Sequence, residues 1–262
     1  MILNDRLVRS AGTHYTTRIV QYRVIEEIAM RLPKILRYIA LAAFAALTAS
    51  ARAEEHQNQF IPEIDAFITL SERTRLYLYG NLTENLTTNS TDSELGANVD
   101  YTLVPIFRTE LRKADWARDR YLWTRVGYAN LSSPDNRGNG PTERRGILEL
   151  TGRIPLPNEV SLVSRGRVDL RDIGGEFSQR YRVRLGIEKE VIIGGVVTVP
   201  YIQAEDFYDT RYDAWIQQLY QTGIEIELSK SWRVEAFLAR QNNQRSASSN
   251  VDQLGLTLKY YH

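Results

Sequence analysis

Residues 180–191 read Arg-Tyr-Arg-Val-Arg-Leu-Gly-Ile-Glu-Lys-Glu-Val, and charged and apolar side chains alternate along them. Successive side chains of a β-strand point to opposite faces, so a strand here has one charged face and one apolar face. Many soluble sheets show the same pattern. In this chain the two-residue period returns in strand after strand behind a secretory leader, and this combination predicts an all-β protein, an antiparallel transmembrane β-barrel of the bacterial outer membrane.

Residues 30–53 have the parts of a signal peptide. A basic start is followed by an apolar, alanine-rich run over residues 39–47 and by Ala51-Arg52-Ala53, a small-x-small cleavage pattern. The apolar run is far shorter than the roughly 20 residues of a spanning helix, so we interpret residues 30–53 as a cleaved leader. Residues 1–29 are interpreted as an over-extended start or a disordered extension upstream of Met30, with a genuine cytoplasmic extension as the alternative.

The composition excludes several classes of function. The chain has no cysteine, so a disulfide framework and a thiolate metal site are excluded. Outside residues 1–53 it holds 25 basic and 29 acidic residues, and this acidic balance argues against a nucleic-acid partner. The three histidines, His14, His56 and His262, lie outside every predicted strand interior and long loop, which argues against a histidine-dependent hydrolase. We therefore expect no enzyme activity, no catalytic residue, no metal and no cofactor.

Eleven strands can be read from the alternation, each long enough to cross a bilayer at a tilt. The connections between them alternate between short turns and longer polar loops such as residues 132–143 and 173–177, which is typical of outer-membrane barrels. The predicted strands cover residues 60–70, 74–85, 94–104, 119–131, 144–155, 160–172, 178–191, 196–209, 213–228, 232–242 and 251–261.

An odd count conflicts with the even strand number of bacterial single-chain barrels. We therefore expect about 12 strands over residues 54–262, with 10 as the alternative; a twelfth strand would lie near residues 54–60 or 105–118. The last strand carries an unbroken apolar face of Leu254, Leu256, Leu258 and Tyr260. Such a strand resembles the one that the barrel-assembly machinery recognises, although those strands usually end in an aromatic residue and this chain ends in His262.

The alternation points many charged side chains into the lumen, and they divide into two walls. The middle strands contribute a basic wall of Arg125, Arg145, Arg153, Arg165, Arg167, Arg171, Arg180, Arg182 and Arg184. The first strand and the later strands, which become neighbours when the barrel closes, contribute an acidic wall of Glu63, Asp65, Glu205, Glu225, Glu227 and Glu235.

Two interpretations of these walls stay open. In one, opposed charges create a transverse field across a small channel that passes polar or charged solutes. In the other, the arginines and acids pair with each other and fill a narrow barrel, whose outer loops bind a partner. A membrane enzyme that acts on lipid or polysaccharide is the third and weakest interpretation. Lipid of the outer membrane is an expected partner in all three.

Three segments also resemble a known family. They are Gly-Arg-Val-Asp-Leu-Arg at 166–171, Arg-Tyr-Arg-Val-Arg-Leu-Gly-Ile-Glu-Lys at 180–189 and Pro-Tyr-Ile-Gln-Ala-Glu-Asp-Phe-Tyr-Asp at 200–209. Together they are similar to the uncharacterised bacterial "domain of unknown function 2490" family. The resemblance covers most of residues 60–262 and implies a barrel-like fold, but it implies no activity and no site residues.

Overall fold

The computed structural model describes residues 56–103, 121–133, 142–244 and 250–262. The chain divides into two units, Met1–Arg52 and Ala53–His262, and every described residue belongs to the second unit. The predicted leader (30–53) and the upstream residues 1–29 thus lie outside the described residues. The segment 105–118, one of the two places proposed for a further strand, lies outside them as well.

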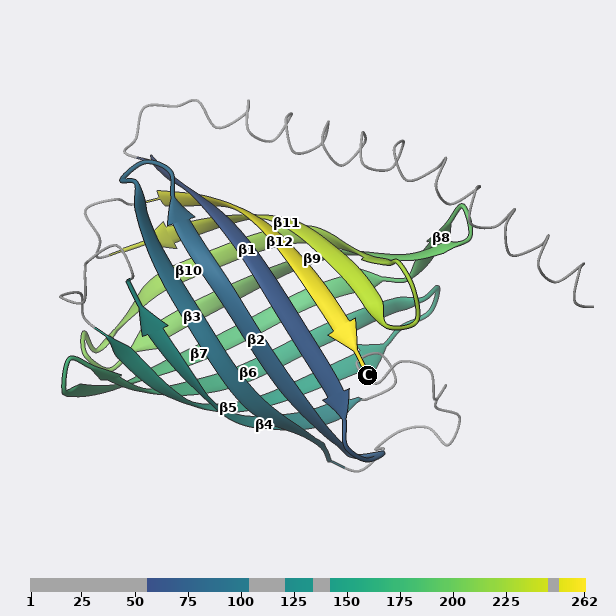
Figure 1. The fold of residues 1–262 in the computed structure, drawn as a ribbon, viewed down its shortest axis with the longest axis horizontal. Coiled ribbons are helices and arrows are strands. Elements are labelled where there is room, and N and C mark those ends of the chain that lie inside the picture. Colours follow the sequence, from purple (N-terminus) through teal and green to yellow (C-terminus); the bar gives the residue numbers. More distant parts are fainter. Residues whose placement is uncertain (1–55, 104–120, 134–141, 245–249) are drawn as a thin grey trace, which may run out of the picture. The chain divides into compact units, whose positions relative to one another are not determined.

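The described residues form one sheet of twelve strands (Figure 1). Each of the eleven predicted strands is present, and each begins within four residues of the position read from the alternation. The strands are β1 (His56–Thr69), β2 (Thr74–Asn85), β3 (Ser90–Thr102), β4 (Leu122–Ser132), β5 (Glu143–Pro155), β6 (Val160–Ile173), β7 (Glu176–Lys189), β8 (Val191–Ile193), β9 (Val196–Asp209), β10 (Ala214–Glu227), β11 (Trp232–Asn243) and β12 (Asn250–Tyr261).

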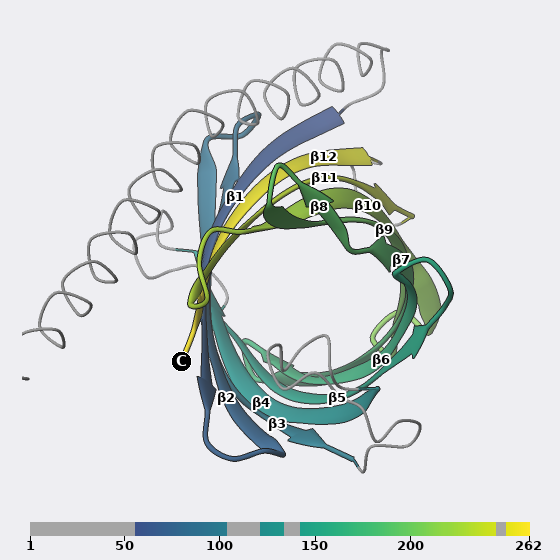
Figure 2. The same ribbon diagram turned by 90° about the vertical axis from the view of Figure 1, so that its right-hand side faces the viewer.

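The sheet closes into a barrel, so the predicted fold class is confirmed (Figure 2). Eleven of the described strands form the ring, and β8 is a three-residue strand that pairs with β9 beside the ring. Because eleven strands cross, β1 and β12 run in the same direction, and they pair in parallel from His56↔Asn250 to Phe67↔Tyr261. Every other neighbouring pair in the ring is antiparallel. The even strand number expected of the ring is therefore not observed; the twelfth strand is β8.

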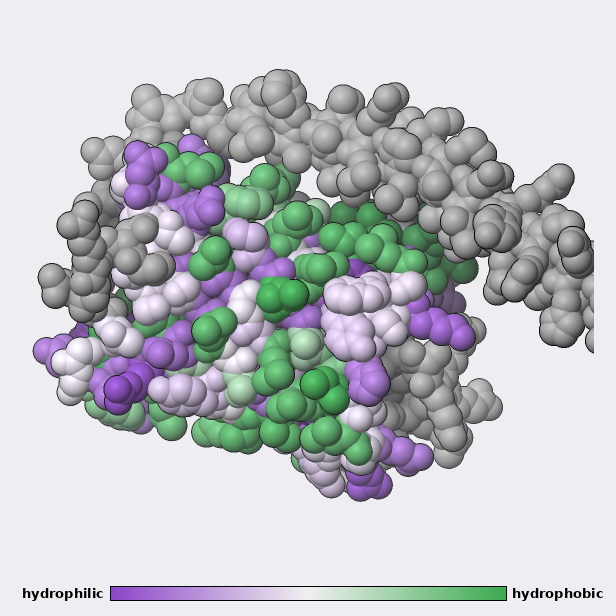
Figure 3. All heavy atoms as spheres, viewed as in Figure 1, coloured by the Kyte–Doolittle hydropathy of each residue, from purple (hydrophilic) through white to green (hydrophobic). Residues whose placement is uncertain are grey.

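The two faces of each strand meet different surroundings, as the alternation predicts. On β7, Val183, Leu185 and Ile187 point outward and are about half exposed. Figure 3 shows apolar side chains gathered over the outward face of the strands. The inward face instead holds buried charged groups such as Asp169 and Glu205. This reversal of the usual globular arrangement is expected when lipid surrounds a barrel with a polar interior. Among the described residues, no helix is long and apolar enough to cross a membrane.

Glycine pairs make the tightest turns of the barrel. Gly174 and Gly175 join β6 to β7 with φ angles of 61° and 90°, and Gly194 and Gly195 join β8 to β9 with φ angles of 62° and 84°. Two successive positive φ angles fit the twist of a two-residue hairpin, and glycine adopts them without steric cost. The connection predicted over residues 173–177 is therefore shorter than expected, because the strands continue to residues 173 and 176.

Candidate functional site

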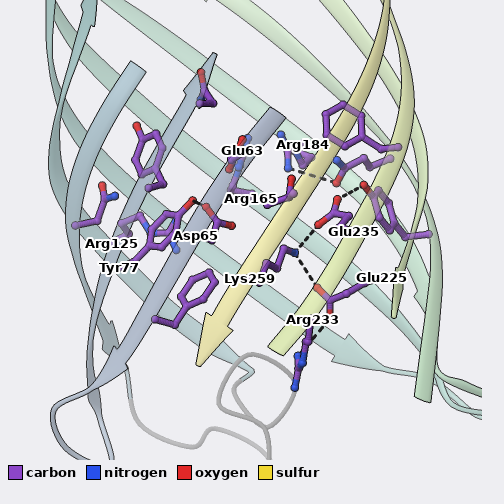
Figure 4. Close-up of a pocket in the computed structure, with 18 of the residues that line it drawn as sticks. Glu63, Asp65, Tyr77, Arg125, Arg165, Arg184, Glu225, Arg233, Glu235 and Lys259 are labelled. Atoms are coloured by element: carbon purple, nitrogen blue, oxygen red, sulfur yellow. Dashed lines mark hydrogen bonds and ion pairs between the residues drawn. The ribbon is translucent and has the colours of Figure 1, made fainter. Parts of the chain in front are cut away.

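A polar cavity of ≈ 480 Å³ lies inside the barrel, and residues from all eleven ring strands line it (Figure 4). Eleven of the fifteen charged residues predicted to face the lumen contribute to this lining. They are Arg125, Arg145, Arg153, Arg165, Arg167, Arg182, Arg184, Glu63, Asp65, Glu225 and Glu235.

The other four predicted lumen residues also point inward but lie in ion pairs away from the cavity lining. Arg171 donates to Glu143 Oε1 at 2.6 Å and to Asp209 Oδ2 at 2.5 Å, and Arg180 donates to the same oxygen of Asp209 at 3.4 Å. Glu227 lies 3.9 Å from Arg233. Glu205 is almost completely buried beneath three arginines.

The centre of the basic wall is a two-by-two group on β6 and β7, here called the arginine quartet: Arg165, Arg167, Arg182 and Arg184. The register places Arg165 directly opposite Arg184, and Arg167 directly opposite Arg182. Like charges directly opposite each other destabilise a sheet, so the quartet needs counter-charges from neighbouring strands.

Glu205 on β9 is the main counter-charge of the quartet. It accepts hydrogen bonds from Arg165 at 2.6 Å, from Arg182 at 2.8 Å and from Arg184 at 2.6 Å. The prediction that Glu205 belongs to the acidic wall is therefore wrong. The reason is the register. It pairs Glu205 with Arg184 on β7, whereas Glu225 on the neighbouring strand β10 stands opposite Val199, six residues along β9 from Glu205.

Two further acids complete the charge balance of the quartet. Asp169 accepts a hydrogen bond from Arg167 Nε at 2.6 Å and lies 3.7 Å from Arg182. Glu149 lies 3.8 Å from Arg165 and 4.0 Å from Arg167. The side chains of Asp169, Glu149 and Glu205 are at most 4% exposed, and none of the three lines the cavity. The acids thus lie behind the arginines, and the guanidinium groups face the cavity.

The acidic wall on β10, β11, β12 and β1 is organised around one lysine. Lys259 Nζ on β12 lies 2.7 Å from Glu225 and also pairs with Glu235, as the dashed lines in Figure 4 show. Glu63 and Asp65 make no ion pair with any described residue; Asp65 accepts a hydrogen bond from the Tyr77 hydroxyl at 3.0 Å. All four acids line the cavity, so this wall presents carboxylates to it.

Glycines hold two lumen tyrosines in place. A Cβ added at Gly96 would lie 2.1 Å from the Tyr79 ring, and one at Gly223 would lie 2.5 Å from the Tyr201 hydroxyl. The rings therefore lie flat against the neighbouring strand, a close approach that only glycine permits. From this position Tyr79 donates to Glu94 at 2.5 Å and Tyr201 donates to Glu235. The glycines thus position two carboxylates of the lumen.

Several lumen groups are absent from the predicted set. The most important are Lys259, which joins the acidic wall, and Asp100, which accepts hydrogen bonds from both Arg75 and Arg125. The alternation places Lys259 inward, opposite the apolar face of the last strand, so its position could be read from the sequence. Asp100 also lies on the polar face of its strand, opposite Leu95 and Val99, so its inward direction could be read as well. Its pairing with two arginines depends on the register between strands, which alternation does not give.

A metal site is not evident in the described part of the chain, since no group of three or more histidine, aspartate and glutamate side chains there could hold an ion. The groups that line the cavity can form hydrogen bonds and pair charges. Arginine forks can bind carboxylate or phosphate in a bidentate manner, and the carboxylates can accept hydrogen bonds from cations.

Several solved structures are similar to this barrel in fold. The β domain of the Bordetella autotransporter BrkA is 13% identical with a TM-score of 0.42, and the match covers 74% of this chain and 83% of that chain. LpxR from Salmonella typhimurium is 10% identical with a TM-score of 0.40, covering 71% and 83%. A loop deletion mutant of OmpT, an outer membrane protein of Vibrio cholerae, is 10% identical with a TM-score of 0.36, covering 70% and 60%.

At these identities the similarity concerns the fold alone. No protein-family model matches the chain, and no curated protein matches it either. The resemblance to the uncharacterised bacterial family therefore stays a prediction from the three segments that carry it.

Proposed function

We propose that this protein is a barrel of the bacterial outer membrane whose lumen passes small polar or charged solutes. The observation that carries the proposal is the polar cavity of ≈ 480 Å³, which has the arginine quartet on one side and the acidic wall on the other. Charged side chains that line a lumen select solutes by sign, and low-dielectric walls focus their field.

The order of the strands supports two opposed walls. Counting around the ring, β6 is five strands from β1 in one direction and six in the other, so β6 and β7 lie across the lumen from β1 and β12. The quartet therefore faces Glu63 and Asp65 across the barrel. A solute in the cavity would experience a transverse field, which favours ions and dipolar molecules over neutral ones.

The location in the outer membrane rests on sequence signals together with the surface. Residues 30–53 resemble a secretory leader, and the outward strand faces carry exposed apolar side chains suited to contact with lipid. The apolar face of β12 would present Leu254, Leu256 and Leu258 to the barrel-assembly machinery. No catalytic role is part of the proposal; the described residues that line the cavity include no histidine.

Single-channel recording in planar bilayers tests the proposal. The full barrel is expected to conduct small ions, and absence of ion current from correctly folded protein would contradict the channel. Arg167→Glu or Arg182→Glu is expected to shift the permeability ratio toward cations by about threefold to tenfold, since ~1 kcal/mol of local electrostatic energy corresponds to roughly fivefold. An unchanged ratio in both variants would show that these side chains do not act on permeating ions.

One observation favours a second candidate, a barrel with a filled lumen whose outer loops bind a partner. Phe67, Tyr77 and Tyr261 stack on adjoining strands with ring centroids 4.6 and 4.8 Å apart, and Arg75 lies over the Phe67 ring at 4.3 Å. Together with the ion pairs, such packing can occupy a small barrel. The same recordings separate the candidates, since a filled barrel folds normally and carries no current.

A further inference from the structure

We propose that the arginine quartet binds the phosphate group of a small soluble solute inside the lumen. This inference names a substrate class for the proposed channel and rests on that function, because the solute must reach the cavity. Three features of the quartet carry it: the opposition of like charges, the layering of acids behind cations, and hydrogen-bond donors that remain free.

The first feature is that the two opposed arginine pairs of the quartet lower the stability of the sheet. Two arginine pairs stand directly opposite each other on β6 and β7, where the side chains of neighbouring strands are close. A glutamine at one position of each pair would remove the repulsion. Arrangements that break a local rule of stability without an evident gain in packing are expected at functional sites.

The second feature is that the positive charge is directed at the cavity. The acids that neutralise the quartet, Glu205, Asp169 and Glu149, are buried behind it and do not line the cavity. The four guanidinium groups do line the cavity, and their side chains are 10–21% exposed. A solute in the cavity therefore meets cations first, even though the total charge of the region is nearly balanced.

The third feature is the set of free donors at the middle of the quartet. Arg167 donates a hydrogen bond to a described residue only from Nε. Its Nη1 lies 4.0 Å from Glu149, beyond hydrogen-bond distance, and its Nη2 makes no hydrogen bond to a described residue. Arg182, directly opposite, donates from Nε and Nη2 to Glu205. Its Nη1 lies 3.7 Å from Asp169, beyond hydrogen-bond distance, and so makes no hydrogen bond within the described residues. Two adjacent forks with free N–H groups suit an anion with several oxygens.

Phosphate matches this site better than a simple halide does. Its tetrahedral oxygens can accept from two guanidinium forks at once, and charge-assisted hydrogen bonds of this kind are among the strongest in proteins. Its charge complements a group of four cations with three acids behind them. The carboxylates of Glu63 and Asp65 across the lumen would repel the anion, which would keep it at the quartet.

The test measures phosphate in two independent ways on the full barrel. Inorganic phosphate is added during single-channel recording in potassium chloride, and it is titrated into the detergent-solubilised protein by calorimetry. Phosphate at millimolar concentration is expected to reduce the chloride current and to release or absorb heat on binding. The double variant Arg167→Gln/Arg182→Gln is expected to weaken both effects by at least about tenfold.

Two further variants make the test specific. Arg167→Lys/Arg182→Lys keeps both charges but loses the forks, so binding is expected to fall between wild type and the glutamine variant. Arg240→Gln removes an arginine that pairs with Asp252, and neither of these two residues lines the cavity, so phosphate binding is expected to stay unchanged. Heat-modifiable migration on a denaturing gel verifies that each variant is folded.

The outcomes separate this inference from the proposed function. Ion current with no effect of phosphate and no binding heat would overturn the phosphate site and leave the channel standing. Phosphate heat that the glutamine variant loses, without any ion current, would support the site and overturn the channel. Equal phosphate binding by the wild type and the glutamine variant would overturn the assignment to the quartet.

Discussion

The arginine wall and the acidic wall both place charge in the lumen, but they neutralise it in different ways. On the arginine wall, one nearly inaccessible carboxylate, Glu205, accepts hydrogen bonds from three arginines, and the acids lie behind the cations. On the acidic wall, one lysine, Lys259, pairs with Glu225 and Glu235 at the cavity surface, while Glu63 and Asp65 have no ion pair with a described residue. One wall is layered, and the other is a single layer.

This difference indicates where charge is needed for stability and where it is available for a solute. A counter-ion shared by several like charges is essential, because its removal leaves several largely buried charges unpaired. A charge without such a role can be changed with little effect on folding. Replacing a glutamate by glutamine is therefore expected to lower stability strongly on the arginine wall and only slightly on the acidic wall.

The largest effect is expected for Glu205→Gln. Loss of the carboxylate leaves three converging arginines without their shared partner, and breaking a buried ion pair costs about 3–5 kcal/mol. Urea unfolding in detergent, followed by tryptophan fluorescence, measures the change. The matched variant on the other wall, Glu63→Gln, is expected to change stability by less than ~1 kcal/mol, because Glu63 has no described cation partner. Similar losses for both variants would contradict the difference between the walls.

A somewhat smaller loss is expected for Lys259→Met. Glu225 and Glu235 stand directly opposite each other on β10 and β11. Lys259 pairs with both, whereas Arg233 pairs with Glu225 at 3.2 Å. The expected loss is about 2–3 kcal/mol, below that for Glu205→Gln, because the Lys259 side chain is 14% exposed and that of Glu205 only 1%. The same unfolding assay applies, and Lys259→Met/Glu235→Gln should recover part of the loss.

The smallest effect on stability is expected at Gly96, where packing and not charge pairing holds a lumen side chain in place. An alanine at Gly96 would clash with the Tyr79 ring and displace its hydroxyl from Glu94, and overpacking of this kind costs about 1–3 kcal/mol. Gly166→Ala is the control, because a Cβ there would have no neighbour within 4 Å. We expect Gly96→Ala to lower the midpoint of urea unfolding and Gly166→Ala to leave it nearly unchanged; equal midpoints would exclude a positioning role for Gly96.

Most of the fold could be predicted because each strand carries its own signal. The alternation of residues 160–172 and 178–191 alone places the strands β6 and β7 and the faces of their arginines. The strand number of the ring could not be derived in this way. Whether the ring has an odd or an even number of strands depends on which strands pair where the sheet closes. The closing contact here is the parallel pairing of β1 with β12, the first and last strands of the chain.

The candidate site could be predicted only in part for a related reason. Alternation identifies Arg165, Arg184 and Glu205 as inward-facing residues, but it does not give the register between strands. The register decides that Arg165 stands opposite Arg184 and that Glu205 is paired with Arg184. The same limit explains why Asp100 was missed as the shared partner of Arg75 and Arg125.

By itself the sequence determined the strands, the direction of each side chain and the presence of two charge types in the lumen, because these follow from a local two-residue period. Only the tertiary structure decided the closure of an odd-numbered ring, the opposition of arginines on β6 and β7, and the burial of acids behind them. These features depend on contacts between strands that are far apart in the chain, and a local period carries no information about such contacts.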